Sequence, residues 1–476
     1  MSSLLIRNAA AIMTGLAGSA ARHAGPDLRI RDDRIAAIGT LTPEAGDQIL
    51  DATDCVIYPA WVNTHHHLFQ ALLKGDPLGI NATLTPWLAA TPYRFRAGFD
   101  EDIFRLAARV GLVELALSGC ATVADHNYLY YPGQDFDSSA VLFEEAEALG
   151  LRFVLCRGGA TITRGLESGL PQALRPESLD AFLADIERTA SRFHDPAPDS
   201  MRRVVVAPTT PPYSMRPEEL RETAAFARHH GLLLHSHLSE TVGYQDSTHA
   251  AHNMTPVRFC ESVGWLGEDV WFAHLVKLDA EEIALLGATG TGIAHCPQSN
   301  GRLGSGIAPI RALEAAGVPV SIGVDGAASN EAADMISETH AAWLMQRARA
   351  GHEARPLHRG GAGEAGADEA TVEDVIRWGS SGGAAVLGLP DIGSLAPGMA
   401  ADIAIYALDQ SPRYFGMHDI AIAPVACGGA AHLKSLFVAG NEVVHEGAIA
   451  GLDIGELAFE ARNAVKTLKQ RAERAG

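Results

Sequence analysis

The sequence predicts an α/β protein: a (β/α)8 TIM-like barrel that carries a small β-sandwich built from both ends of the chain. Through the middle of the 476 residues, short apolar runs alternate with helix-length amphipathic stretches, which is typical of parallel βα units. Eight of these runs can be distinguished, and eight parallel strands close a barrel. Runs typical of antiparallel strands come before and after this region.

The predicted sandwich is divided between the two ends of the chain. Its first part is residues 1–57 and its second part is residues 389–450. Short apolar runs separated by Gly, Pro and Asp mark its strands, at residues 4–8, 28–31, 34–39, 55–57, 401–406 and 436–444. Because both ends carry the same kind of run, we expect them to form one sandwich together.

The predicted barrel covers residues 58–388. Its eight strands are expected at residues 58–64, 121–126, 152–157, 203–208, 232–237, 270–274, 292–296 and 319–325. The segment of residues 75–100 is longer and more irregular than an ordinary βα turn, so we expect this segment to be a mobile cover over the pocket. Residues 351–368 are Gly/Ala-rich, which is typical of a poorly ordered connector. The last unit, residues 451–476, is expected to be an amphipathic helix that packs on the barrel.

The composition argues against several classes of function. The chain has 37 Lys and Arg against 57 Asp and Glu, a net charge of −20, which repels nucleic acids and anionic membrane surfaces. The six cysteines form no CxxC pair and are typical of free core thiols in a reducing compartment. No apolar run reaches the ~18 residues of a membrane helix. We therefore expect a cytoplasmic protein that acts on a small molecule.

The first chemical motif is a histidine pair at the end of the first predicted barrel strand. His65 and His67 are two residues apart, so both side chains point to one face of the strand while His66 points to the other. This geometry offers two nitrogens to one metal ion. The alternative is a histidine-rich strand end with ordinary hydrogen bonds.

The fifth predicted strand offers a second pair, His235 and His237, which also share a face. Spacing alone does not choose between them. His237 is nearer the strand end and Glu240 follows it, so we expect His237 to be the third ligand and His235 to be a buried neighbour.

Three further residues are candidates for the proton transfers of a hydrolytic reaction. Asp325 would be both a metal ligand and the general base, or else the cap of the next helix. His274 would orient the attacking water, or be a plain core histidine. Glu240 would deliver protons to a ring nitrogen and to a departing amine, or be a solvated residue at a helix start.

Two absences narrow the chemistry further. The fourth predicted strand ends without a lysine that could be modified to bridge two metals, so one ion is expected. The chain also lacks an HxE motif followed by PCxxC, which excludes the zinc deaminase design that is used on cytidine and on nucleic-acid bases.

Together these residues resemble the amidohydrolase superfamily, in its cytosine/guanine-deaminase-like branch with a single metal ion. The likeness covers nearly the whole chain. It implies one Zn²⁺ per chain, with Fe²⁺ as the alternative, bound by His65, His67, His237 and Asp325. It also implies catalytic roles for Glu240, His274 and Asp325. Members of the branch are often oligomeric, so a homo-oligomer is the expectation by analogy.

Longer strings at residues 59–70, 125–128, 239–246, 294–300 and 325–330 resemble members of this branch that act on fused bicyclic heterocycles. The likeness implies hydrolytic deamination of isoxanthopterin, with 8-oxoguanine as the second candidate and an s-triazine alkylamine as the third. The alternative from a different functional class is a non-catalytic ligand-binding or scaffold protein. The complete set of metal and acid positions argues against it.

Both bicyclic substrates are flat lactams with an amino group between two ring nitrogens. Gln70 could pair with such an edge through one donor and one acceptor, and related deaminases use the matching glutamine in this way. Arg157 would contact a ring carbonyl or, equally, pair with a core carboxylate. Tyr128 and Tyr130 would stack on the ring. His295 and Asn300 are expected to shape a loop.

Overall fold

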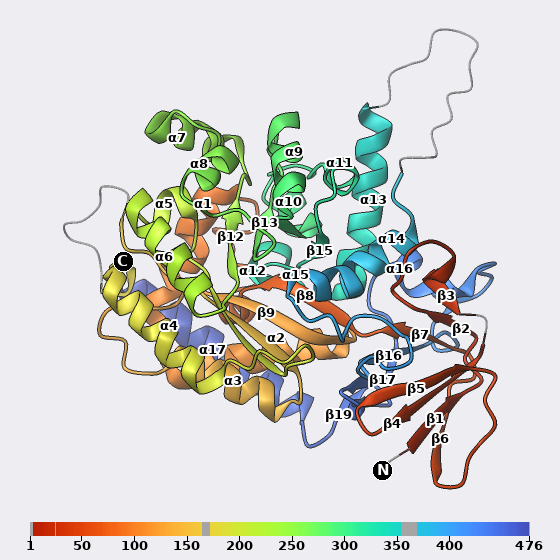
Figure 1. Ribbon diagram of the computed structural model, residues 1–476. Helices are drawn as coiled ribbons and strands as arrows, with labels where there is room; N and C mark the ends of the chain where they lie inside the picture. Colours follow the sequence, from red (N-terminus) through yellow and green to blue (C-terminus); the bar gives the residue numbers. More distant parts are fainter. Residues whose placement is uncertain (1–2, 24, 164–171, 354–368, 476) are drawn as a thin grey trace.

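The computed structural model describes residues 3–23, 25–163, 172–353 and 369–475. Figure 1 shows helices gathered around a central set of strands, with further strands from both ends of the chain beside them. The predicted fold class is confirmed: eight parallel strands form one sheet, and two other sheets are built from the ends.

The barrel sheet has the order β15-β14-β13-β12-β11-β10-β9-β8, so that each strand lies beside its neighbour in sequence. Its strands are β8 (Trp61–His66), β9 (Cys120–Asn127), β10 (Arg152–Arg157), β11 (Arg202–Val206), β12 (Leu234–Leu238), β13 (Val270–His274), β14 (Gly292–His295) and β15 (Val320–Ile322). A parallel bridge between His66 and Asp325 joins the last strand to the first and closes the barrel. The C-terminal ends of all eight strands therefore open onto one face.

Helices follow the strands and cover the outside of the barrel (Figure 1). The principal ones are α2 (Glu101–Leu117), α3 (Ser138–Ala148), α4 (Leu179–Phe193), α6 (Pro217–His229), α7 (Val242–His252), α8 (Pro256–Ser262), α9 (Ala280–Thr289), α10 (Pro297–Arg302), α11 (Ile310–Ala315), α13 (Met335–Glu353) and α14 (Val372–Arg377). Local sequence sets their ends. In α9, for example, Asp279 and Glu282 form a capping box, and Gly290 adopts the left-handed conformation that ends the helix.

The sandwich combines two sheets. The four-stranded sheet is β5-β4-β1-β6, with β1 (Ser3–Arg7), β4 (Asp27–Arg31), β5 (Arg34–Gly39) and β6 (Asp47–Asp51). The seven-stranded sheet is β19-β18-β17-β16-β7-β2-β3, with β2 (Ala11–Met13), β3 (Arg22–His23), β7 (Cys55–Pro59), β16 (Ile403–Ala407), β17 (Leu433–Val438), β18 (Asn441–His445) and β19 (Ala448–Ile449). Leu28 and Ile30 of one sheet share an apolar core with Ile57, Ile403 and Ile405 of the other.

The first barrel strand starts later than the sequence pattern predicts. Tyr58 and Pro59 belong to β7, where they pair with Ala404 and Ile403 of the sandwich. The barrel strand begins at Trp61. The continuous apolar run hides this change of sheet, because both strands are fully buried and no polar residue separates them.

Residues 75–100 fold into short helical segments, namely α1 (Leu84–Leu88), η3 (Ala89–Tyr93) and η4 (Arg96–Gly98). The indole N–H of Trp87 donates to the carbonyl of Ala328 at 3.0 Å, close to the end of the eighth strand. Arg302 donates to the carbonyls of Gly79 and Ala82. These bonds place the segment against the face on which the strand ends open; whether it moves stays a prediction.

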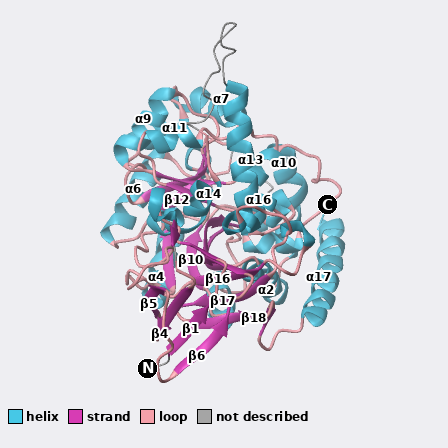
Figure 2. Ribbon diagram, turned by 90° about the vertical axis from the view of Figure 1, so that its right-hand side faces the viewer, coloured by secondary structure: helices cyan, strands magenta, loops and turns pink. Residues whose placement is uncertain are grey.

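The final helix, α17 (Ile454–Ala475), runs along the side of the barrel (Figure 2). Arg471 ties it to the barrel through an ion pair with Asp100 and a hydrogen bond to the carbonyl of Gly98. The predicted connector 351–368 begins inside α13, and its residues 354–368 lie outside the described residues. Within the described ranges, no helix is long and apolar enough to span a bilayer. All six cysteines are free thiols.

Candidate metal and active site

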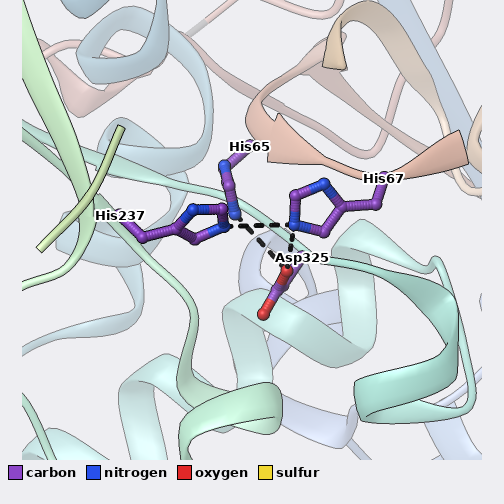
Figure 3. Close-up of side chains that lie close together, drawn as sticks. All are labelled: His65, His67, His237 and Asp325. Carbon is purple, nitrogen blue, oxygen red and sulfur yellow. Dashed lines mark hydrogen bonds and ion pairs between the residues drawn. The ribbon is translucent and has the colours of Figure 1, made fainter. Parts of the chain in front are cut away.

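Four side chains from distant parts of the chain converge at the open face of the barrel. They are His65 and His67 near the end of β8, His237 in β12 and Asp325 just after β15 (Figure 3). One nitrogen or oxygen of each lies within 4.8 Å of those of the others. The group is secluded, since His65 is fully buried and Asp325 is 5% exposed.

The separations within this group match those of ligands around one tetrahedral ion. His67 Nε2 lies 3.2 Å from His237 Nε2 and 3.2 Å from Asp325 Oδ1, and His65 Nε2 lies 3.4 Å from the same oxygen. Two atoms bound at about 2.0–2.1 Å to a tetrahedral zinc ion are about 3.3 Å apart. His65 Nε2 is also a buried nitrogen without a hydrogen-bond partner among the described residues. The donor set therefore fits a zinc-like ion.

Main-chain carbonyls set the protonation of two of the rings. His67 Nδ1 lies 2.7 Å from the carbonyl oxygen of His126, and His237 Nδ1 lies 2.6 Å from that of Thr209. A carbonyl can only accept, so each Nδ1 carries the proton and each Nε2 presents its lone pair to the centre. Burial holds the pKa of His237 well below its usual value, so this ring is neutral, as a metal ligand must be.

Asp325 lies beyond the end of its strand, and hydrogen bonds hold both its main chain and its carboxylate. β15 ends at Ile322, and Asp325 adopts a left-handed φ of 62°, which aspartate tolerates better than most residues. Its N–H donates to the carbonyl of His65 at 2.9 Å. The N–H of Gly326 donates to Oδ1 at 2.7 Å, and Ser299 donates to Oδ2 at 2.6 Å. These bonds aim the carboxylate at the three imidazoles.

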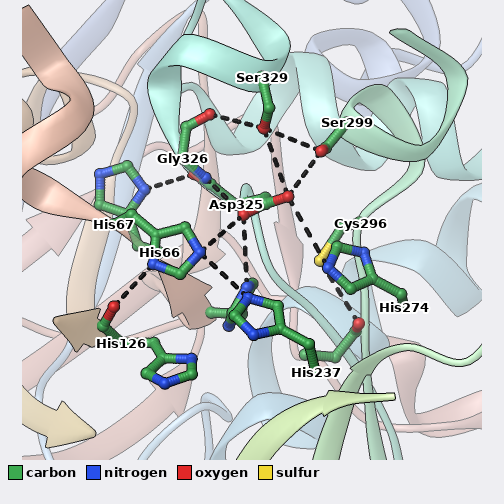
Figure 4. A network of polar contacts seen from close by, with 12 residues as sticks. His66, His67, His126, His237, His274, Cys296, Ser299, Asp325, Gly326 and Ser329 are labelled. Carbon is green, nitrogen blue, oxygen red and sulfur yellow. Dashed lines mark hydrogen bonds and ion pairs between the residues drawn. The ribbon is translucent and has the colours of Figure 1, made fainter. Parts of the chain in front are cut away.

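Glu240 and His274 lie beside this group (Figure 4 shows His274 near Asp325). His274 Nε2 is 3.8 Å from Glu240 Oε2 and 4.0 Å from Asp325 Oδ2. Burial raises the pKa of Glu240, which favours the protonated acid, and Ser305 donates to Oε1 at 3.2 Å. His274 therefore lies between two carboxyl groups, one of which favours its protonated form.

Gln70 and Tyr128 line the same region. The amide of Gln70 donates to the hydroxyl of Tyr128 at 2.9 Å, whereas its Oε1 has no partner among the described residues. Tyr128 turns its ring edge-on to His67, with 5.0 Å between the ring centroids. Gln70 approaches the strand end closely because position 326 is glycine: a Cβ there would lie 2.0 Å from Gln70 Oε1. One buried acceptor therefore remains free for a ligand.

Arg157 and Tyr130 have other partners. The guanidinium of Arg157 forms ion pairs with Glu177 and Asp185 and lies 3.8 Å from the centroid of the Tyr130 ring. The hydroxyl of Tyr130 is 2.9 Å from that of Ser139. These contacts match the alternative in which Arg157 pairs with core carboxylates.

Sequence patterns did not single out Ser299 and Ser305, because isolated serines carry little signal on their own. Asn300, which the sequence predicts to shape a loop, places its Oδ1 2.9 Å from His274 Nδ1. Ser299, Asn300 and Ser305 all follow the seventh barrel strand, whose C-terminal end opens onto the same face as the histidines. Their position after this strand is the feature of the sequence that could have identified them.

Comparisons with known proteins identify the family of the chain. Residues 56–443 match the model of the amidohydrolase family. The chain is 67% identical to an isoxanthopterin deaminase from an unknown prokaryotic organism, over 98% of this chain and 97% of that protein. It is 38% identical to an 8-oxoguanine deaminase of Pseudomonas aeruginosa, over 98% and 99% of the two chains.

Solved structures show the same relationship. An amidohydrolase from an environmental sample of the Sargasso Sea is 59% identical, with a TM-score of 0.85 over 98% of this chain and 99% of that one. Atrazine chlorohydrolase from Arthrobacter aurescens TC1, solved in complex with zinc, is 27% identical, with a TM-score of 0.86 over 97% and 100% of the two chains. This chain therefore belongs to the amidohydrolase family.

Proposed function

We propose that this protein is a zinc-dependent hydrolytic deaminase, a hydrolase of C–N bonds in cyclic amidines, and that its substrate is isoxanthopterin. The products would be 2,4,7-trihydroxypteridine (violapterin) and ammonia. The observation that carries the proposal is the 67% identity to an isoxanthopterin deaminase over nearly the whole chain. The buried set of three imidazoles and a carboxylate supports the hydrolytic part of it.

In this proposal His65, His67, His237 and Asp325 hold one zinc ion. A bound zinc ion lowers the pKa of water toward neutrality and so supplies a nucleophile near pH 7. The carboxylate of Asp325 accepts the proton of the attacking water, since its oxygens border both the histidines and His274. His274 orients that water through Nε2.

Glu240 is the proposed acid. Attack at an amino-bearing ring carbon requires a proton on the adjacent ring nitrogen and then another on the departing amine. Burial raises the pKa of Glu240, so its carboxyl group can deliver the first proton. The departing amine then takes the proton that Asp325 received from water, passed on through Nε2 of His274 and Glu240. The hydroxyl group on the ring carbon gives its proton to Glu240 as the carbonyl forms, which restores the acid.

Gln70 and Tyr128 are the proposed contacts to the heterocycle. The free Oε1 of Gln70 would accept from a ring N–H or amino group, and Tyr128 would border the ring plane. Arg157 and Tyr130 are proposed to support Gln70 and Tyr128 from behind and not to contact the heterocycle directly. The reason is that the guanidinium of Arg157 is already paired with Glu177 and Asp185.

The second candidate substrate is 8-oxoguanine, which the 38% identity to an 8-oxoguanine deaminase favours. It shares with isoxanthopterin a lactam and an amino group between two ring nitrogens. The same acid and metal positions would serve an s-triazine alkylamine, the third candidate. A cytoplasmic location, a homo-oligomeric state and Fe²⁺ as the alternative metal stay predictions from the sequence.

The test is ammonia release from isoxanthopterin, pterin, 8-oxoguanine and guanine, measured side by side with the zinc-loaded protein. We expect kcat/KM for isoxanthopterin to exceed that for 8-oxoguanine by about tenfold or more. A higher kcat/KM for 8-oxoguanine would overturn the substrate and leave the deaminase proposal standing. Failure to release ammonia from any of the four would overturn both.

A further inference from the structure

A second histidine lies directly behind His65, on the side away from Asp325. His235 Nε2 is 2.8 Å from His65 Nδ1, and His235 Nδ1 is 3.0 Å from the carbonyl oxygen of Trp271. Both rings are completely buried. His235 therefore links His65 to the main chain of β13.

The carbonyl of Trp271 determines which nitrogen carries the proton in both histidines. The carbonyl of Trp271 can only accept, so Nδ1 of His235 carries the hydrogen. A neutral His235 then presents a lone pair at Nε2, and His65 must donate from its Nδ1. The opposite direction requires a charged imidazolium, which is costly in a fully buried position where no carboxylate hydrogen-bonds to His235 among the described residues.

We propose that His235 is a positioning residue that fixes the tautomer and orientation of His65. It holds the proton of His65 on Nδ1, so that the Nε2 lone pair faces Asp325 Oδ1, 3.4 Å away, and stays available to a metal ion. This inference rests on the proposed metal site. His235 acts on the ion only through His65.

Trp271 holds His235 in place. The indole lies against the imidazole, with ring centroids 4.5 Å apart and planes inclined by 20°. Its N–H donates to the carbonyl of Thr64, the residue before His65, at 3.1 Å. The same tryptophan therefore fixes both ends of the His65–His235 pair.

This arrangement distinguishes His65 from the other two imidazoles. His67 and His237 donate from Nδ1 to main-chain carbonyls, which no substitution of a side chain removes. His65 depends on a side chain for the same bond. Replacing His235 therefore releases one ring of the donor set selectively.

The competing explanation is a second metal ion held by His65, His126 and His235, whose ligand atoms also lie within 4.8 Å of one another. The 2.8 Å between His65 and His235 argues against it. That distance is a hydrogen bond, whereas nitrogens on one tetrahedral ion are about 3.3 Å apart. The number of bound ions separates the two explanations.

The experiment compares zinc affinity, by competition with a chromogenic chelator, and zinc stoichiometry in the full-length protein and four variants. His235→Phe keeps the stack on Trp271 without a nitrogen. The amide of His235→Asn stands near the Nδ1 position, on the Trp271 side, whereas the amide of His235→Gln stands near the Nε2 position, where its oxygen can accept from His65 Nδ1. His295→Phe is the matched control, because His295 is an equally buried histidine of the same barrel sheet, on β14, two strands away from β12.

We expect His235→Phe and His235→Asn to weaken zinc binding about 10–100-fold. His235→Gln should stay within about threefold of the unmodified protein because it restores an acceptor for His65 Nδ1. His295→Phe should leave zinc affinity unchanged. The Asn and Gln pair keeps the test decisive if the phenylalanine variant does not fold.

Equal zinc affinity in all variants would overturn the inference, and so would equal weakening in the Gln and Asn variants, which indicates a merely structural role. Two ions per chain that fall to one in His235→Phe would replace it with a second metal site. If the unmodified protein binds no zinc, the proposed function itself fails, so the two failures are distinguishable.

Discussion

The main-chain N–H of Asp325 donates to the carbonyl oxygen of His65 at 2.9 Å. This bond lies where the bridge between His66 and Asp325 closes the barrel. Two members of the candidate donor set, 260 positions apart by their numbers (325 − 65), are therefore fixed by the closure itself. Closure of the barrel therefore brings these two residues side by side.

Asn63 tests this relationship. Its Oδ1 accepts from the N–H of Val324 at 3.0 Å, one residue before Asp325. Asn63→Ala leaves that buried N–H without a partner and should lower the free energy of unfolding by about 1–3 kcal/mol, measured by urea denaturation. Thr122→Val is the control, because the buried Thr122 hydroxyl has no partner among the described residues. An Asn63→Ala variant as stable as the control would contradict the closure argument.

Glu240→Gln should separate chemistry from metal binding. Because the amide cannot deliver a proton, kcat should fall by about 10²–10⁴-fold, while zinc content and thermal stability stay unchanged. Ser305→Ala removes only the 3.2 Å hydrogen bond to Glu240 and should cost less than about tenfold. Near-normal turnover of Glu240→Gln would show that another group is the acid.

Asp125 should make stability depend on pH. Burial raises the pKa of this carboxyl group from 3.8 to about 7 in the folded protein. Between about pH 4 and pH 7 the unfolded chain loses this proton while the folded chain keeps it, so stability falls as pH rises.

Asp125→Asn carries no such proton and can still accept from the N–H of Leu68, as Asp125 does. Its stability relative to the unmodified protein should therefore improve from pH 4 to pH 7, by up to about 4 kcal/mol. Urea unfolding of the metal-free proteins across this range measures the difference. Parallel curves for the two proteins would refute the raised pKa.

The 75–100 segment should open more often when its anchor is weakened. Trp87→Phe keeps the apolar ring but loses the hydrogen bond to Ala328, so amide exchange across the segment should accelerate about 5–10-fold. Trp265→Phe is the matched control, because that indole donates to Leu220 on the outside of the barrel. If the segment exchanges as slowly as the barrel strands in both variants, it is not a mobile cover.

The barrel and the sandwich could be predicted because alternation of strands and helices is a local pattern. The same holds for the histidines at the end of β8, because a spacing of two predicts that His65 and His67 share one face. The passage from β7 to β8 could not be predicted in this way, because Tyr58 and Trp61 are equally buried in different sheets.

The details of the site depend on contacts between distant segments, which no local pattern contains. The pattern predicts Asp325 at a strand end, but β15 stops three residues earlier, and the main-chain N–H of Asp325 is held by the carbonyl of His65 in β8. Whether Arg157 faces a ligand or a core carboxylate depends on Glu177 and Asp185, which approach it only in the folded chain. The hydrogen bond between His235 and His65 could not be predicted from the sequence either.

The central claim is that His65, His67, His237 and Asp325 together bind one divalent ion. Metal analysis after equilibration with zinc, for protein prepared without chelators, tests it most directly. We predict one zinc ion per chain, lost in Asp325→Ala and retained in Glu240→Gln. A folded protein that binds no zinc, or an Asp325→Ala variant that binds it as tightly as before, would contradict the account.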